Sequence, residues 1–267
     1  MLRIQHDGPW WVLWLDAPAS RNALTDEMVS GLRHALQDAA LAPGVRAVLL
    51  RGAGGTFCAG GDFGRFRSLM AEPAPADGPD PIALFNRAFG AMLEVLAHSP
   101  LLTLACVEGA AMGGGCGLAA ACDVVLAADN AVLATPELTL GLPPAQIAPF
   151  VAARLGERQA LRLMASGQRI QAAQALQIGL VDEVLAPAEL DTALATWRER
   201  LLRAEPQALR ATKAILAQRQ QGAGLSETLD FAAEAFARSL RSGTASEGLA
   251  ALGAKRAPAW ATWKDPA

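Results

Sequence analysis

The chain has 267 residues, which is long enough for one large hydrophobic core with a terminal extension and too short to assume two independent domains. Apolar residues make up 52% of it, yet no uninterrupted apolar run reaches the roughly 18 residues of a membrane-spanning helix. The net charge is −3 and the 23 Lys and Arg residues are scattered, which excludes the basic patch typical of nucleic-acid-binding proteins.

Targeting signals and metal-binding patterns are both missing from the sequence. The first residues show no basic segment followed by an apolar stretch and a cleavage site, so we expect no secretory signal and a cytoplasmic protein. The four cysteines form no CxxC pair and are expected to be buried free thiols. Because the three histidines are far apart and show no zinc-ligand spacing with the cysteines, we predict no metal site.

The first half of the chain alternates strands with helices. "WWVLWLDAP" indicates a strand that ends at Pro18, and the helix after it has Thr25 as its N-cap. "VRAVLLRG" indicates a buried strand that enters the glycine-rich loop "GAGGTFCAGGDF". The segment "AEPAPADGPDP" holds four prolines in eleven residues and predicts a mobile surface loop. The helix "ALFNRAFGAMLEVLAHS" and the strand "PLLTLACVEG" then repeat the pattern.

The second half becomes mostly helical from about Pro149. Before that point, "VVLAADNAVLATPE" predicts two short strands around an Asp-Asn turn, and later a helix ends at Gly179 and leads into a brief strand. We expect a core in residues 1–200 and a helical oligomerisation region in residues 201–267, where three helices follow Leu201. One of these carries an apolar stripe that requires a partner surface: Leu225, Leu229, Ala232, Ala233, Phe236 and Leu240.

The glycine triplet in "EGAAMGGGCGLAAACD" stands directly before a small, apolar, helix-like run. A dinucleotide fingerprint fails because Leu118 occupies the place of its last glycine, and a phosphate loop fails because no lysine lies between Gly109 and Asp123. The remaining functional interpretation is close approach of a ligand to the first turn of a helix, where free N–H groups favour negative charge. Tight turns and helix packing explain the glycines equally well on pattern alone.

A second glycine element, Ala59–Gly60–Gly61, also follows a buried strand. Two backbone N–H groups, one from each element, can converge on a single oxygen atom. This is the arrangement of an oxyanion hole, in which the loss of one donor costs about 10² to 10³ in rate.

Six segments occur in the order found in one enzyme family, and the chain thereby resembles the crotonase superfamily, the enoyl-CoA hydratases and isomerases. The resemblance implies an α/β fold, a spiral of repeated ββα units with a C-terminal helical extension that forms trimers or dimers of trimers. It places the two N–H groups that grip the thioester carbonyl of an acyl-CoA on Ala59 and Gly114. The segments are "RNALTDEM", "GTFCAGGDF", "VEGAAMGGGCGLAAACDVVLA", "TPELTLGLPP", "ALQIGLVDEV" and "ALGAKRAPAW".

The same resemblance implies a coenzyme A site, with the coenzyme as part of the substrate and no covalently bound cofactor. Arg21 and Lys255 suit the coenzyme because guanidinium and ammonium groups bind phosphates by charge-assisted hydrogen bonds. The residues expected to contact the substrate are Arg21, Ala23, Ala59, Gly60, Gly61, Asp62, Phe63, Gly113, Gly114, Gln146 and Lys255.

Hydratases of this family usually carry two glutamates, and this chain has only the second, Glu137 in "ATPELTLGL". Gly117 stands where the first would be. Glu137 can act alone, because one carboxylate can take a proton from water and return a proton to carbon. The alternative is a carboxylate from elsewhere, such as Asp77 or Asp80 of the proline-rich loop.

The segment "PPAQIAPFV" replaces the "PGAGG" of typical straight-chain hydratases. Together with Gly117, it is similar to bacterial hydratases of isohexenylglutaconyl-CoA and 3-methylglutaconyl-CoA, whose substrates carry a second carboxylate. Gln146 is expected to hold that carboxylate or the reacting water, or else to be a core-edge amide. The sequence therefore favours a hydratase, and leaves open an isomerase or another enolate-forming enzyme, or a non-catalytic acyl-CoA-binding protein.

Overall fold

A computed structural model describes residues 1–73, 75 and 77–263. Residues 74 and 76 of the predicted proline-rich loop and residues 264–267 of the predicted C-terminal region lie outside the described residues. No helix among the described residues is long and apolar enough to cross a membrane.

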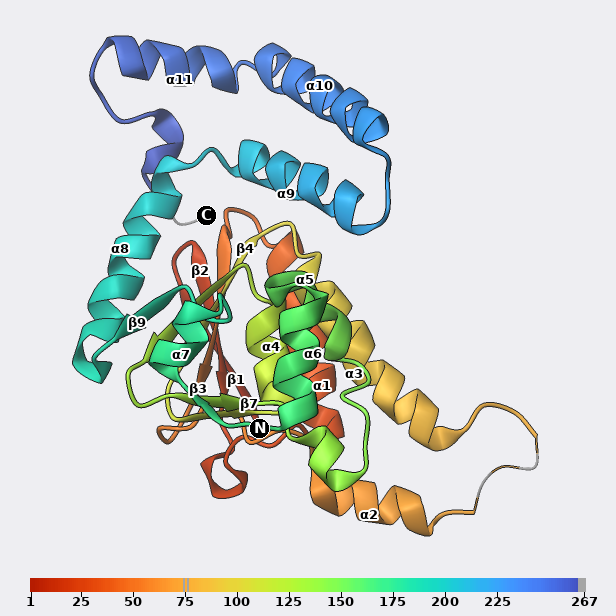
Figure 1. Cartoon of the computed structure of the whole chain (residues 1–267). Coiled ribbons are helices and arrows are strands. Elements are labelled where there is room, and N and C mark those ends of the chain that lie inside the picture. Colours follow the sequence, from red (N-terminus) through yellow and green to blue (C-terminus); the bar gives the residue numbers. More distant parts are fainter. Residues whose placement is uncertain (74, 76, 264–267) are drawn as a thin grey trace.

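A six-stranded sheet forms the centre of the molecule (Figure 1). Its strand order is β1-β2-β3-β4-β6-β9, in which β1 pairs antiparallel with β2 and every other pair is parallel. The strands are β1 (Leu2–Asp7), β2 (Trp10–Leu15), β3 (Ala47–Gly52), β4 (Leu102–Val107), β6 (Val124–Ala128) and β9 (Glu183–Leu185).

A second, three-stranded sheet lies beside the first and carries the functional turns. Its order is β5-β7-β8, with β5 parallel to β7 and β8 antiparallel to β7. The predicted strands on either side of the Asp-Asn turn are present, but they belong to different sheets. The strands of this sheet are β5 (Ala110–Met112), β7 (Val132–Ala134) and β8 (Ile170–Gln171).

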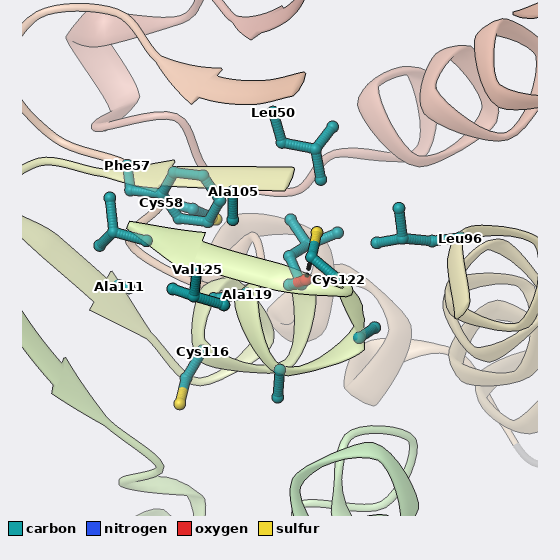
Figure 2. Packing of buried hydrophobic residues seen from close by; sticks show 14 of the residues in the cluster. Leu50, Phe57, Cys58, Leu96, Ala105, Ala111, Cys116, Ala119, Cys122 and Val125 are labelled. Carbon is teal, nitrogen blue, oxygen red and sulfur yellow. Dashed lines mark hydrogen bonds between the residues drawn. The ribbon is translucent and has the colours of Figure 1, made fainter. Parts of the chain in front are cut away.

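Helices cover both faces of the six-stranded sheet. The core on one face includes residues of α1, α3, α4, α5, α6 and α7, and the core on the other face includes Leu190, Leu194 and Leu201 of α8. Figure 2 shows the first of these cores, where Ala119 of α4 lies beside Ala105 and Val125 of the strands. The helices are α1 (Asp26–Leu41), α2 (Phe63–Ala71), α3 (Pro81–Ala97), α4 (Gly114–Ala121), α5 (Ala148–Leu155), α6 (Glu157–Ser166), α7 (Ala172–Gln177) and α8 (Leu190–Arg203).

The C-terminal helices extend away from the sheets (Figure 1). Lys213 of α9 joins them to the core through Asp123 and through the Leu101 carbonyl, which accepts a hydrogen bond from Nζ at 2.8 Å. On α10, Leu225, Leu229, Phe236 and Leu240 of the predicted stripe are exposed. These helices are α9 (Pro206–Gln220), α10 (Leu225–Arg241) and α11 (Thr244–Gly253).

The strand β1, the helix α2 and the short strands β5 and β8 were not expected from the sequence. β1 is an edge strand whose side chains are mostly exposed, and its two alternating apolar residues, Leu2 and Ile4, are too few to predict a strand. The helix α2 follows the glycine-rich loop directly, because Asp62 caps its N-terminus by accepting hydrogen bonds from Gly64 N at 2.8 Å and Arg65 N at 3.3 Å. By contrast, the predicted N-cap Thr25 is confirmed, since its side chain accepts from Met28 N at 3.2 Å.

Candidate active site

The two glycine elements lie side by side. Cys58 N donates to Ala110 O and Met112 N donates to Cys58 O, each at 2.9 Å, so the loop after β3 runs along β5 up to the start of α4. A Cβ atom built on Gly60 would lie 2.9 Å from Met112 O and 3.9 Å from Gly114 N. The predicted convergence of the two elements is therefore present in the fold, and glycine at position 60 is required by this close approach.

A buried asparagine fixes the first loop. Asn22 is fully buried, its Nδ2 donates to Ala53 O at 2.9 Å and to Thr56 O at 2.6 Å, and its Oδ1 accepts from Ala17 N at 2.9 Å. Satisfied buried amides of this kind hold their surroundings in one geometry. Asn22 was not predicted from the sequence, because a polar residue in a turn gives no sign that it will be buried.

The predicted donor at Ala59 is wrong. Ala59 N donates to Arg21 O at 2.9 Å, so this N–H is already occupied. The N–H groups of Gly61 and Gly114, in contrast, find no acceptor in the described part of the chain. Gly114 is the first residue of α4, where an N–H has no partner inside the helix. Each glycine element thus offers one such donor among the described residues, Gly61 N from the first and Gly114 N from the second.

Glu137 lies against the start of α4. It begins a short 3₁₀ helix, η2 (Glu137–Leu140), and its Oε1 would be only 2.8 Å from a Cβ atom at Gly113. Its Oε2 is buried and has no hydrogen-bond partner among the described residues. Gly113 itself adopts a positive φ of 51° and donates its N–H to Ala134 O at 2.8 Å, so it positions the turn and is not a free donor.

Burial raises the pKa of Glu137 above the ordinary range of a glutamate, and its own backbone N–H partly opposes this shift. If the carboxylate is the base, kcat/KM should fall about tenfold per pH unit below this raised pKa. The folded state holds the proton more tightly than the unfolded state, so raising the pH through the same pKa should lower stability. Measurements of activity and of thermal unfolding across pH 4 to 8 test both expected trends. In a Glu137→Gln variant, the pH dependence that comes from this carboxyl group should be lost from both the activity and the stability.

Apolar and amide side chains surround the start of α4. A Cβ atom at Gly114 would lie 2.7 Å from Leu24 Cδ1 and 3.3 Å from Phe89 Cζ, so both side chains lie against this residue. Gln146 Nε2 donates to Asn86 Oδ1 at 2.8 Å, on the same helix as Phe89. Gln146 is therefore paired with a side chain of α3, and its side chain has no backbone partner in the part of the chain that the structure describes.

The predicted coenzyme-binding residues divide into two groups. Arg21, Ala23 and the loop from Gly60 to Phe63 belong to the turns around Gly61, where Leu24 N donates to Gly60 O at 2.8 Å. Arg21 and Phe63 are exposed there, while the Asp62 carboxylate caps α2. Lys255 belongs to the segment that follows α11, and α11 lies at the end of the molecule opposite α2 (Figure 1).

The four cysteines are buried, and Asp80 of the acidic loop caps a helix. All four cysteines are buried free thiols, as predicted, and burial raises the pKa of Cys58, Cys106 and Cys116 to about 12. Asp80, an alternative source of the missing carboxylate, caps α3 by accepting from Ile82 N at 2.7 Å. No cluster of three His, Cys, Asp or Glu residues suited to a metal ion occurs in the part of the chain that the structure describes.

Comparisons with known proteins agree with this geometry. The family profile of enoyl-CoA hydratase/isomerase matches residues 11–263. A putative enoyl-CoA hydratase from Thermus thermophilus is 34% identical over 250 residues, which cover 92% of this chain and 95% of that protein. The short-chain-enoyl-CoA hydratase of Clostridium acetobutylicum is 32% identical over 235 residues, 87% of each chain.

Solved structures show the same fold. An enoyl-CoA hydratase/isomerase from Marinobacter aquaeolei has a TM-score of 0.93 and 39% identity, covering 98% of this chain and 99% of its own. Pseudomonas aeruginosa AtuE has a TM-score of 0.92 and 40% identity with the same coverage. The predicted crotonase-like α/β architecture with a helical C-terminal region is confirmed.

Proposed function

Because the chain belongs to the enoyl-CoA hydratase/isomerase family, we propose that it hydrates an α,β-unsaturated acyl-CoA with Gly61 N, Gly114 N and Glu137 as its catalytic groups. The observation that carries this proposal is the combination of two free backbone donors with a buried, unpaired carboxylate oxygen on Glu137. The two N–H groups stabilise the negative charge that develops on the thioester oxygen, and Glu137 moves the proton.

The preferred substrate, we propose, is a branched acyl-CoA of the glutaconyl type, which carries a second carboxylate. The support is the amide pair Gln146 and Asn86, because Asn86 stands on the same helix as Phe89, whose ring lies against Gly114. Gln146 Nε2 has one hydrogen left after its bond to Asn86, and an amide N–H is a suitable donor to a carboxylate.

The test of this function uses crotonyl-CoA, 3-methylglutaconyl-CoA and isohexenylglutaconyl-CoA in ¹⁸O- and deuterium-labelled water. Hydroxyl oxygen at the β-carbon identifies a hydratase, and deuterium exchange at the α- or γ-carbon without it identifies an isomerase. Gln146→Leu should lower kcat/KM for the glutaconyl substrates only. Equal kinetics of this variant on all substrates would remove the carboxylate role, and no turnover of any substrate would leave a binding protein.

An assembly of several copies is also part of the proposed function. It is supported by the exposed α10 stripe and by the place of α11, which Lys255 follows in the chain and which lies at the end of the molecule opposite α2 (Figure 1). In a trimer or a pair of trimers, the stripe would be covered and Lys255 would bind the coenzyme of a neighbouring copy. A monomeric mass by light scattering at assay concentration would contradict this arrangement.

A further inference from the structure

Position 117 has no room for any side chain. A Cβ atom built on Gly117 would lie 2.2 Å from Ile147 Cγ2 and 2.7 Å from Ile147 Cβ, and both residues are buried. Ile147 cannot turn its branch away easily, because a β-branched side chain is stiff at χ1. Even with alanine at position 147, its Cβ atom would lie 2.7 Å from a Cβ atom at position 117, which is closer than van der Waals contact.

Neighbouring contacts hold Ile147 in place. It stands directly before α5, and its carbonyl accepts the Val151 N–H at 3.0 Å. The preceding residue, Gln146, is bonded to Asn86 of α3 at 2.8 Å. The segment therefore contacts α3 through one residue and α4 through the next, and Ile147 cannot withdraw without breaking these contacts.

A side chain at position 117 would point toward the reacting groups. Gly117 N donates to Gly113 O at 3.0 Å, so the two residues are one helical turn apart on α4. Side chains of a helix lean toward its N-terminus, and Glu137 Oε1 lies against Gly113. Position 117 is thus the place on α4 from which a second carboxylate would reach the groups around Gly114.

We propose that Ile147 keeps this a one-carboxylate site by filling the space over Gly117. This inference rests on the proposed hydration. Glu137 then carries both proton transfers. Its carboxylate removes a proton from water, the water oxygen bonds to the β-carbon, and the π electrons move to the thioester oxygen as an enolate. The enolate re-forms the carbonyl as the α-carbon takes the proton back from Glu137, so the net change is one added water.

The steric part is tested by comparing Gly117→Ala in two backgrounds. In the wild-type background we expect Tm to fall by roughly 2 to 12 °C. In an Ile147→Gly background the nearest remaining atom is the Ile147 Cα position at 3.6 Å, and the same change should cost nothing further. Gly253→Ala is the matched control, since a Cβ atom at that helical glycine meets nothing within 4 Å and Tm should be equal or higher. An unchanged Tm for Gly117→Ala in the wild-type background overturns the proposal.

The chemical part is tested by Gly117→Glu in the Ile147→Gly background. Relative to Ile147→Gly alone, crotonyl-CoA hydration should rise at least about tenfold and its pH profile should gain a second ionisation. Gly117→Gln in the same background has the same shape without the charge and should give neither. Equal rates and a single ionisation in a folded double variant overturn the proposal. If no variant and no wild-type protein hydrates any substrate while the Tm comparison holds, the proposed function fails and the steric assignment of Ile147 stands.

Discussion

Replacing Glu137 by glutamine is expected to lower kcat by about 10²- to 10⁴-fold, the range of positioned acid–base groups. The change keeps the size of the side chain and removes its ability to exchange a proton. Oε2 of Glu137 has no hydrogen-bond partner among the described residues, so the substitution breaks no ion pair. The fold should therefore be kept, and Tm at pH 7 should be equal or slightly higher, because a buried charge is lost.

Coenzyme A binding separates this result from a loss of the site. The dissociation constant of coenzyme A, measured by calorimetry, should be nearly the same for wild type and Glu137→Gln, since Glu137 lies against Gly113 and is not among the residues expected to contact the coenzyme. Glu157→Gln on the exposed surface of α6 is the control and should keep full activity. Wild-type turnover by Glu137→Gln would mean that another group carries the proton.

Local signals in the sequence were sufficient for most elements of the fold. Thr25 predicted the start of α1, and the apolar run around Val48 and Leu50 predicted a strand buried on both faces, which β3 is. β1 was missed because an exposed edge strand with only two apolar residues gives a weak signal. α2 was missed because Gly64 hides the helical spacing of Phe63, Phe66 and Leu69. These failures concern short elements whose stability depends on neighbours.

The individual motifs of the candidate site could be predicted from the sequence, but the contacts between residues far apart in the chain could not. Glycine patterns and Glu137 follow from short motifs. Which N–H remains free does not, because it depends on a hydrogen bond between Ala59 and Arg21, which are 38 residues apart in the chain. The filled space over Gly117 is a contact with Ile147 from another element, and it leaves no trace in the local sequence.

Removing the Gly114 N–H is expected to cost about 10² to 10³ in kcat, which is the loss found for one donor of an oxyanion hole. Gly114→Pro removes this N–H group and leaves every other hydrogen-bonding group of the helix in place. Proline is well tolerated at the first residue of a helix, where Gly114 stands, because the N–H there has no intrahelical acceptor. Its φ is also close to the helical value that the position already adopts.

Gly114→Ala is the matched control for the added Cβ atom. Both variants place a Cβ atom 2.7 Å from Leu24 Cδ1, the flexible end of a side chain, and 3.3 Å from Phe89 Cζ. The steric loss at Cβ is therefore common to the two, and the ratio of their kcat values reports the lost N–H together with the ring carbons Cγ and Cδ that only proline adds. We expect alanine to keep most of the activity that proline loses, with similar Tm values for both. Equal kcat values would show that Gly114 N does not hold the thioester oxygen, and the assignment of both free amides to an oxyanion hole would then be wrong.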